Sequence, residues 1–434
     1  MRDDLLIRID AAVCAAAPRA ESCFEALRAA TQDGPGVTRP SYQAGEQRAH
    51  DQMAAWACRL GLQVTADAAG NLSMRWPGSA PSLPAWVTGS HLDSVHQGGN
   101  FDGAAGVVAG LLACEALREA GFSPRRDLVV MGFRAEECST WFVGRHGGHL
   151  GSRAALGLLD PAELDTATHI ATGKTLAQMI DAAGFDSARL RQPEPLLPAS
   201  TLAGYVELHI EQGPVLEGAG IPVGVVSSIR GCYRARNASA VGEYSHSGGV
   251  PHEFRRDAVM AVADLLMQMD DEWTRRRGIG EDMVLTFGKL YTEQALHSIV
   301  KVPGRVDFAV DIRSQDNETL MQVEALLRRL ADEIGARRRV RIDLGAIDRV
   351  TPARMAAVLQ TRLDAHARAL GVPTMRIASG GGHDAADFHD VGVPTAMLFV
   401  RNANGSHNPD EAMAMADFIQ GVRVLACFLA EQAG

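Results

Sequence analysis

The residues best suited to chemistry begin in the stretch from 84 to 106, PAWVTGSHLDSVHQGGNFDGAAG. His91 and Asp93 follow an apolar run that predicts a buried strand, and at a spacing of two they share one face of an extended chain. Asp102 comes after a glycine-rich loop, near the start of a predicted helix. An imidazole and a carboxylate at the rim of a sheet could form half of a metal site, although a helix cap and a surface histidine explain them equally well.

Three further candidates stand at equivalent places in the chain. Each lies at the carboxyl end of a predicted strand or in the loop after it: Glu137, His209 and His407. Strands that alternate with helices predict a parallel sheet, in which ligands bind at the carboxyl ends of the strands. A single histidine or glutamate at such an end is usually a cap or is solvated. Five candidates at one edge of one sheet instead favour a metal centre.

Three imidazoles and two carboxylates suit two divalent ions better than one, because a single catalytic zinc takes about three protein ligands. We assign His91 and His209 to one ion, and Glu137 and His407 to the other. Asp102, on a tight loop close to His91 in sequence, is the natural bridge between them. Such mixed ligands predict two divalent metal ions per subunit, with zinc first and manganese, cobalt or nickel as alternatives.

Two carboxylates beside these ligands have predicted roles of their own. Glu136 precedes Glu137 and should point elsewhere, which leaves it free to take a proton from water as a general base. Asp93 is expected to accept the free N–H of His91 and so to fix the tautomer of that ring. The alternative for Asp93 is a loop cap.

Composition excludes several classes of partner. The 434 residues carry a net charge of −10, which argues against a nucleic-acid or anionic-membrane surface. Seven scattered cysteines without a CxxC pair predict reduced thiols. With no secretory leader and no apolar run long enough to cross a bilayer, the sequence predicts a cytoplasmic protein that binds neither nucleic acid nor membrane.

The predicted elements form an α/β protein with an insertion. A mostly parallel sheet is expected in residues 1–220 and 349–434, which together make the catalytic domain, while 221–348 form an inserted α+β domain with an antiparallel sheet. Residues from Ile221 to His246 predict two adjacent strands. Residues 161–190 are expected to be mostly helical.

Five motifs together resemble one family. The sequences GSHLDSVHQGGNFDGAAGV, AEECS, ELHIEQGPVLE, SGGGHDA and GSHNPDE are similar to those of the hydantoinase/carbamoylase branch of the dinuclear-metal aminoacylase and carboxypeptidase superfamily. That branch contains N-carbamoyl-L-amino-acid hydrolases, allantoate amidohydrolases and β-ureidopropionases. The resemblance implies a dinuclear catalytic domain, an inserted lid that also forms a homodimer, the ligand set above and Glu136 as general base.

The resemblance also implies contacts with the substrate. Gln212 should face the substrate, and His246 should reach from the lid of the partner subunit to stabilise an oxyanion. Arg313 matches a lid arginine that grips a substrate carboxylate. His383 and the preceding Gly382 match a loop that lines the pocket.

The lid departs from the family pattern at two places. Ser247–His252 replaces the usual run of a small residue followed by Thr-Thr-Pro-Met, and Val300 stands where an asparagine is usual, with Lys301 as a possible substitute. We therefore expect hydrolysis of a linear amide C–N bond in a small ureido or amide substrate that carries a carboxylate, an N-carbamoyl-L-amino acid first. Allantoate, β-ureidopropionate, and N-acyl amino acids or peptides are the alternatives within enzymes. A binding or scaffold protein with a decayed site is the alternative outside them.

Overall fold

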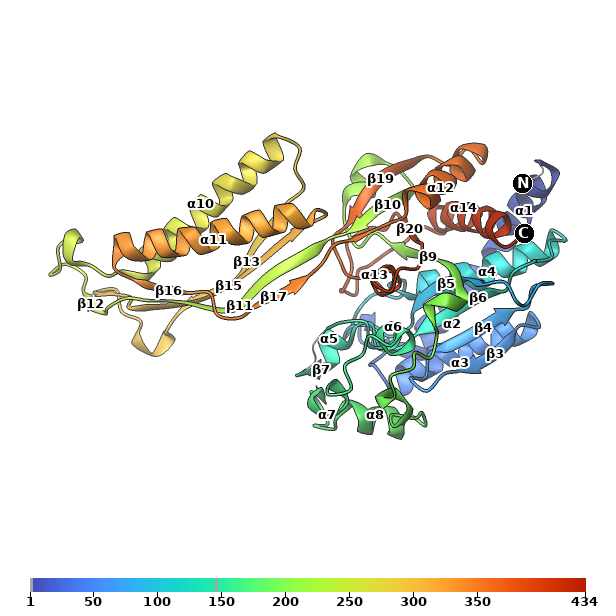
Figure 1. Ribbon diagram of the computed structural model, residues 1–434, viewed down its shortest axis with the longest axis horizontal. Coiled ribbons are helices and arrows are strands. Elements are labelled where there is room, and N and C mark those ends of the chain that lie inside the picture. Colours follow the sequence, from blue (N-terminus) through green and yellow to red (C-terminus); the bar gives the residue numbers. More distant parts are fainter. Residues whose placement is uncertain (1–2, 145–146) are drawn as a thin grey trace. The chain divides into compact units, whose positions relative to one another are not determined.

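The computed structural model describes residues 3–144 and 147–434, which divide into two compact units (Figure 1). Unit 1 comprises Met1–Ser227 and Arg354–Gly434, and unit 2 comprises Ser228–Ala353. Each unit has its own sheet and its own apolar core. Unit 2 is therefore an insertion in the sequence of unit 1.

The central sheet of unit 1 has nine strands, of which the four in the middle run parallel, as the sequence predicts. The order across these four is β20 (Thr395–Val400), β9 (Leu202–Ile210), β5 (Ala85–His91) and β6 (Leu128–Phe133). Further strands flank these four on both sides. Beyond β20 lies β10 (Val223–Ile229), antiparallel to β20, and β10 in turn pairs with β18 (Ala353–Arg354) and β19 (Thr374–Ser379). Beyond β6 lie β4 (Leu72–Trp76), antiparallel to β6, and β3 (Gln63–Ala66), antiparallel to β4.

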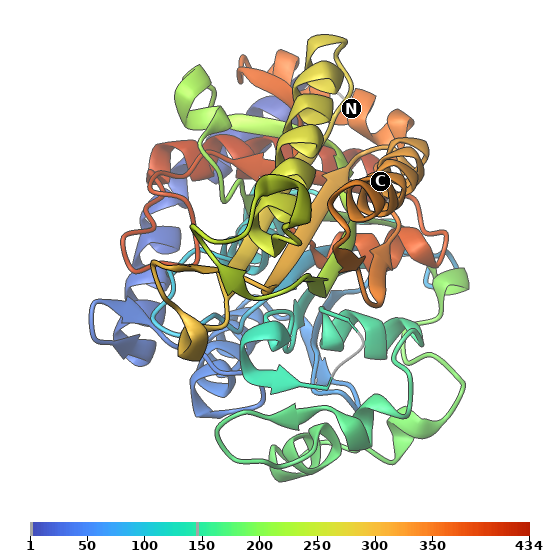
Figure 2. The ribbon, with the colours of Figure 1, turned by 90° about the vertical axis from the view of Figure 1, so that its left-hand side faces the viewer.

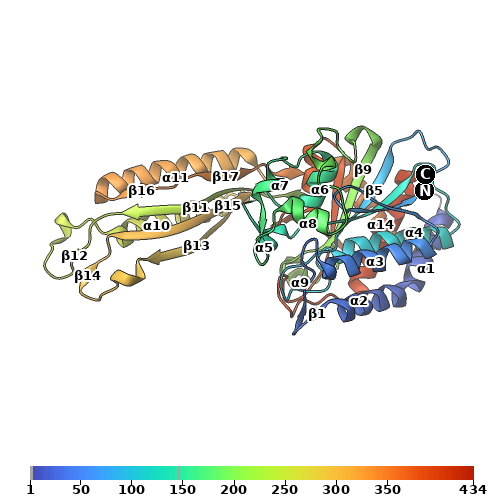
Figure 3. The ribbon, with the colours of Figure 1, turned by 90° about the horizontal axis from the view of Figure 1, so that it is seen from below.

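A layer of helices covers one face of this sheet (Figure 3). Its central member is α4, whose small residues let it approach the strands closely: a Cβ at Gly106 would lie 2.3 Å from the carbonyl oxygen of Leu208. The long apolar helix α14 packs beside α4. The helices of this layer are α1 (Asp3–Ala15), α2 (Ala17–Thr31), α3 (Ala44–Arg59), α4 (Ala104–Glu119), α12 (Ala357–Ala369) and α14 (Met415–Ala433).

Shorter elements lie on the opposite face. Strand residues alternate between the two faces, so Val206 and Leu208 join the core under α4 while Tyr205 points the other way. The ring of Tyr205 stacks on Phe388 of α13 (Asp384–Asp390), with 3.9 Å between the ring centroids. This contact anchors α13 against β9, and α13 in turn contacts α6 (Leu150–Leu156).

Unit 2 has an antiparallel sheet covered on one face by two long helices that contact each other (Figure 2). Burial alternates along β15, where Phe308, Val310 and Ile312 pack under the helices and Asp311 and Arg313 lie on the other face. The elements are β11 (Gly231–Val241), β13 (Val284–Thr292), β15 (Arg305–Ser314), β16 (Arg341–Asp343), β17 (Ile347–Val350), α10 (Ala258–Gly278) and α11 (Asn317–Arg338). A separate two-stranded pairing joins β12 (Ser245–His246) to β14 (Lys301–Val302).

Two sequence predictions are wrong. The two strands predicted between Ile221 and His246 are not neighbours, because β10 pairs with β20 in the sheet of unit 1 whereas β11 pairs with β15 in unit 2. Residues 161–190 contain only two short α-helices and the start of one 3-10 turn, because Gly173 and Gly184 interrupt the apolar spacing. The elements within residues 161–190 are α7 (Glu163–Thr166), β8 (Thr168–His169) and α8 (Leu176–Ala182). Before them come α5 (Cys138–Trp141) and β7 (Phe142–Val143), and after them comes α9 (Val215–Ala219). The remaining short strands, β1 (Gln32–Asp33) and β2 (Gly36–Val37), form a hairpin near the N-terminus.

Among residues 3–144 and 147–434, every helix is too short or too polar to cross a bilayer.

Candidate active site

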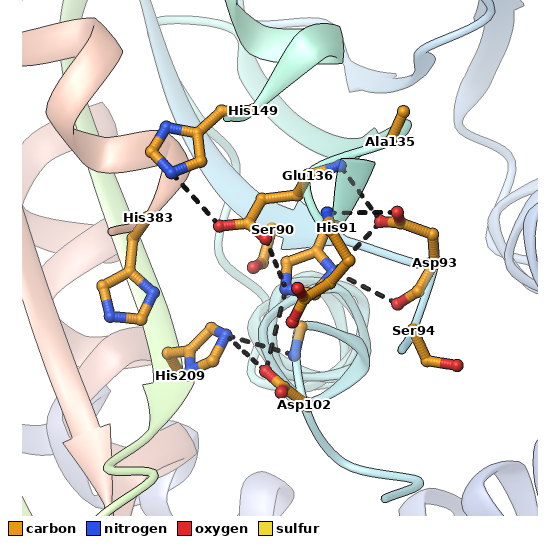
Figure 4. A network of polar contacts seen from close by, with 12 residues as sticks. Ser90, His91, Asp93, Ser94, Asp102, Ala135, Glu136, His149, His209 and His383 are labelled. Carbon is orange, nitrogen blue, oxygen red and sulfur yellow. Dashed lines mark hydrogen bonds and ion pairs between the residues drawn. The ribbon is translucent and has the colours of Figure 1, made fainter. Parts of the chain in front are cut away.

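The parallel strands of unit 1 deliver the predicted ligands to one edge of the sheet (Figure 4). His91 is the last residue of β5, and His209 lies one residue before the end of β9. Asp102 stands two residues before α4, which begins at Ala104. The carboxyl ends of adjacent parallel strands and the loop before α4 therefore place these three side chains together.

The first group of possible ligands is His91, Asp102 and His209. Nε2 of His209 is 3.2 Å from Asp102 Oδ1, and Nε2 of His91 is 3.8 Å from the same oxygen. The other nitrogen of each ring faces a backbone carbonyl, at 2.9 Å from Ile210 for His209 and at 3.2 Å from Asp93 for His91. Nδ1–H donates to the carbonyl in each ring, so Nε2 is the atom that would bind a cation at the shared centre; in His209 this nitrogen also lies 3.2 Å from the backbone N–H of Gly103.

The second group is Asp102, Glu137 and His407. Nε2 of His407 is 2.7 Å from Glu137 Oε1 and 3.2 Å from Asp102 Oδ2. Asp102 thus presents one oxygen to each group. The side chain of His407 is 49% exposed, whereas His91 and His209 are buried. The second group is therefore the more open of the two.

The donor atoms of both groups fit divalent cations. Within each group they lie within 4.8 Å of one another, and they are the imidazole nitrogens and carboxylate oxygens that zinc and similar ions take as ligands. Burial favours a protonated Asp102, but hydrogen bonds with His209 and His407 hold the pKa of its carboxyl well below the usual range. An ionised, shared carboxylate is what a bridging ligand requires.

Glu136 lies beside these groups without belonging to either. Its Oε2 is 3.8 Å from Nε2 of His91, and its Oε1 is 3.4 Å from Nε2 of His149. Burial is the largest influence on this carboxyl and, against the opposing effect of the two histidines, raises its pKa to about 8. A carboxylate with a raised pKa can hold and release a proton near neutral pH, as a general base must.

Asp93 has more partners than the sequence predicted. Its Oδ1 is 3.3 Å from Nδ1 of His91, which is the predicted contact. It also accepts hydrogen bonds from the backbone N–H groups of Glu136 and Glu137, each at 3.1 Å, and from the hydroxyl of Ser41 at 2.8 Å. Asp93 therefore ties the His91 loop to the turn that presents Glu136.

The predicted pocket residues of unit 1 also lie close to this cluster. Nε2 of Gln212 donates to both oxygens of Asp102. The buried ring of His383 lies 4.5 Å from that of His209, centroid to centroid, and its Nε2 is 2.8 Å from the hydroxyl of Ser379. Burial lowers the pKa of His383 well below its usual value, so this ring is neutral.

His246 and Arg313 belong to unit 2. His246 is exposed, and its Nδ1 accepts from the backbone N–H groups of Gly248 and Gly249 at 3.1 and 3.0 Å. This leaves the proton on Nε2. Arg313 forms an ion pair with Asp311 at 2.8 Å. Their predicted roles remain predictions.

Several polar neighbours of the ligands were missed in the sequence. His149 and Asp387 line up behind Glu136, and Glu411 with Ser406 supports Asp102, whose Oδ2 accepts from Ser406 Oγ at 2.8 Å. Glu207 is buried near His209 and His383. The local sequence around His149, GGHLGS, carries no signal for this role, because its contact depends on pairing between distant segments.

Comparison with known proteins agrees with this fold. The profile of Peptidase family M20/M25/M40 matches residues 87–431. An N-carbamoyl-L-amino acid amidohydrolase from Geobacillus stearothermophilus is 36% identical over 395 residues, which are 91% of this chain and 93% of that protein. An allantoate amidohydrolase from Escherichia coli K12 is 33% identical and covers 91% of this chain and 92% of its own length. A crystal structure of a hydantoinase/carbamoylase family amidase from Burkholderia ambifaria superposes with a TM-score of 0.83 at 28% identity, covering 96% of this chain and 98% of that one.

The largely parallel sheet, the inserted antiparallel domain and the candidate metal-binding groups define a hydrolase with the M20 architecture. The chain belongs to the M20/M25/M40 peptidase family, in its hydantoinase/carbamoylase amidase branch. It is thus a member of an amidohydrolase family that acts on linear amides.

Proposed function

We propose that this protein hydrolyses the C–N bond of an N-carbamoyl-L-amino acid or a related ureido acid. One observation carries the proposal: the carboxylate of Glu136 stands beside two possible ligand groups that share Asp102. The substrates named for the relatives at 36% and 33% identity support this class. A scaffold protein would have no chemical need for a buried free carboxylate beside such groups.

The residues of this chain suggest how the reaction would proceed. His91, Asp102 and His209 would hold one divalent ion, and Asp102, Glu137 and His407 a second. When bound, such ions lower the pKa of water and polarise a carbonyl group. Glu136 accepts the proton of the water that attacks the carbamoyl carbon, and it returns that proton to the departing nitrogen. Zinc suits the ligands, with manganese, cobalt and nickel as alternatives.

We further propose that unit 2 acts as a lid and as the surface of a homodimer. Two local features support substrate roles there. Because Nδ1 of His246 accepts two backbone N–H groups, its Nε2–H is available to an oxyanion. Lys301 lies opposite His246 in the pairing of β14 with β12, so a cation stands next to the proposed oxyanion donor. Arg313 would bind the substrate carboxylate in competition with Asp311.

The lid proposal has a complementation test. If His246 of the partner subunit completes each site, mixed dimers of His246→Ala with Glu136→Gln should regain activity that neither variant has alone. Separately tagged subunits, copurified through both tags, would verify the heterodimer. No gain of activity in verified heterodimers would reject this role of His246, whatever the substrate.

The primary test is ammonia release from purified protein loaded in turn with zinc, manganese, cobalt and nickel. The panel comprises N-carbamoyl-L-amino acids, allantoate and β-ureidopropionate, with N-acetyl amino acids and dipeptides as controls. Ammonia from an N-carbamoyl-L-amino acid above the rate on the controls would support the proposal. Cleavage of the acyl or peptide controls alone would instead assign the protein to deacylases or peptidases. Hydrolysis of none of the compounds would reject the proposed substrates.

A further inference from the structure

The imidazole of His149 lies between two carboxylates, one of which is the proposed base. Its Nε2 faces Glu136 (Figure 4), at 3.4 Å from Oε1 of that carboxylate. Its Nδ1 is 3.3 Å from Oδ2 of Asp387. The same oxygen of Asp387 accepts a hydrogen bond from Ser152 Oγ at 2.7 Å. Ser152, Asp387, His149 and Glu136 thus form one continuous polar chain that ends at the candidate metal centre.

Backbone pairing sets His149 opposite Glu136. The N–H of His149 donates to the carbonyl of Glu136 at 3.2 Å, and the next N–H, that of Leu150, donates to Ala135 at 3.1 Å. His149 has φ 50° and ψ 51°, a left-handed conformation that is unfavourable for a residue with a Cβ. Such a conformation persists only where the surroundings fix it, and it is frequent at functional sites.

A glycine on the opposite wall makes room for the ring. A Cβ at Gly382 would lie 2.7 Å from Nε2 of His149 and 3.0 Å from its Cε1. Gly382 was expected in the pocket lining because of its motif, SGGGHDA. The geometry gives a specific reason for a glycine there, because any side chain would displace the His149 imidazole from Glu136.

The two oxygens of Glu136 are divided between two directions. Oε2 faces His91, a possible metal ligand, and Oε1 faces His149. Without a partner on Oε1 the carboxylate could rotate about its last bond and turn either oxygen to the water. A donor on Oε1 restricts that rotation. The anchor is firm, because α13 carries Asp387 and is held against β9 by the stacked rings of Phe388 and Tyr205.

We propose that His149 is a positioning residue for Glu136, with Asp387 fixing its imidazole so that Oε2 of Glu136 stays directed at the candidate metal centre. The inference rests on the proposed function only in taking Glu136 as the base. His149 itself need not touch the substrate.

The kinetic test uses whichever substrate the wild-type enzyme hydrolyses. His149→Phe removes the ion-pair partner of Glu136 at similar volume and should lower kcat about 10- to 100-fold, comparable to the loss of an interaction with a charged group, with KM within about twofold. His149→Gln, whose amide reaches the place of Nε2, should recover part of kcat. Bound metal should match the wild type, whereas thermal stability should fall in His149→Phe, because the buried carboxylate of Asp387 loses its imidazole partner, and His149→Gln should recover part of it. His389→Phe is the matched control, because His389 lies on α13 and pairs with the carboxylate of Asp390.

A double-mutant cycle separates positioning from a general structural role. If His149 acts through Glu136, the substitution His149→Phe should have no further effect on the residual rate of Glu136→Gln. Multiplicative losses would overturn the proposal, as would a kcat of His149→Phe within twofold of the wild type.

A readout that needs no substrate keeps the inference separate from the proposed function. In protein labelled with ¹⁵N-histidine, the ring signals that vanish in His149→Phe belong to His149. These signals should shift in Glu136→Gln and stay in place in Glu253→Gln, a control at an exposed glutamate of unit 2. Unshifted signals in Glu136→Gln would overturn the proposal even in an active enzyme. A shift in a protein that hydrolyses nothing on the panel would support the contact while the proposed function fails.

Discussion

Nε2 of Gln212 donates to both carboxylate oxygens of Asp102, at 3.1 and 3.0 Å. The backbone supports this geometry, since the N–H of Gln212 donates to Asn402 Oδ1 at 3.0 Å and its φ is 62°. A carboxylate that bridges two cations must offer one oxygen to each. The amide of Gln212 and bound cations would therefore compete for the same lone pairs of Asp102, and the amide would become free for a substrate only when cations hold that carboxylate.

Gln212→Ala should consequently strengthen metal binding while it weakens substrate binding. We expect the apparent Kd for zinc to fall about three- to tenfold, because the competing hydrogen bonds to a charged group are lost. KM should rise about tenfold. Competition with a chelating dye measures the first effect, and initial rates measure the second. Gln192→Ala, at an exposed position, is the control. Weaker metal binding in Gln212→Ala would contradict this competition.

Removing Asp102 and removing His407 should change metal content differently. Asp102 belongs to both groups, so Asp102→Ala should leave well under one ion per subunit. His407 belongs only to the more exposed group, so His407→Ala should retain about one ion, held by His91, Asp102 and His209. Elemental analysis after gel filtration gives both numbers. Equal loss of metal in the two variants would argue against a shared Asp102.

Metal affinity should rise with pH. Hydrogen bonds with Asp102 and Glu137 raise the pKa of His407 in the metal-free protein to about 11, so a cation must displace a proton from this ring. The imidazole of His407 keeps its proton below about pH 11, and each rise in pH makes it easier for a cation to displace that proton. Calorimetric titrations with zinc in buffers of different ionisation enthalpy should therefore detect proton release on binding. Binding without proton release would contradict this protonation state.

The strand-end rule was enough to predict that the candidate ligands lie together, because adjacent parallel strands must place their carboxyl ends side by side. His91 and His209 follow directly from that rule. The positions of the residues that contact Glu136 from the other side do not follow from that rule. His149 depends on backbone pairing with Glu136, and Asp387 depends on the docking of α13, more than two hundred residues further along the chain. No local periodicity encodes such contacts.

The same limit applies to the fold. The sequence predicted the parallel centre of the sheet, since helix and strand alternate there. It misassigned the partner of β10 because β10 and β11 follow each other closely and both have strand composition. Pairing of β10 with β20 joins residues about 175 positions apart, and only tertiary packing selects that partner over the nearby β11.

The variant Glu136→Gln should bind metal as the wild type does but should lose most of its catalytic activity. The amide has nearly the same shape as the carboxylate but cannot accept the proton of water, so kcat should fall about 10²- to 10⁴-fold. KM and metal content should change little, because Glu136 is outside both ligand groups. Glu194→Gln, on an exposed loop, controls for the loss of one charge. A rate within tenfold of the wild type would remove Glu136 as the base.

The buried pair of Glu46 and Arg134 should support both stability and rate. Glu46 accepts from the N–H of Ala135 at 2.9 Å and from Nη1 of Arg134 at 2.9 Å, and both charged side chains are almost wholly buried. Glu46→Ala leaves a buried cation without its carboxylate, which should lower the free energy of unfolding by about 3–5 kcal/mol. It also frees Ala135, whose φ of 54° belongs to the turn that presents Glu136.

A second variant separates the two effects. In Glu46→Leu combined with Arg134→Met the unpaired charge is gone, so much of the stability should return. The anchor on the N–H of Ala135 stays lost, however, and kcat should remain low. Urea unfolding and initial rates on the same samples measure both quantities. Recovery of kcat together with stability would show that this pair supports the fold alone, whereas recovery of stability without kcat would show that it also aims the turn before Glu136.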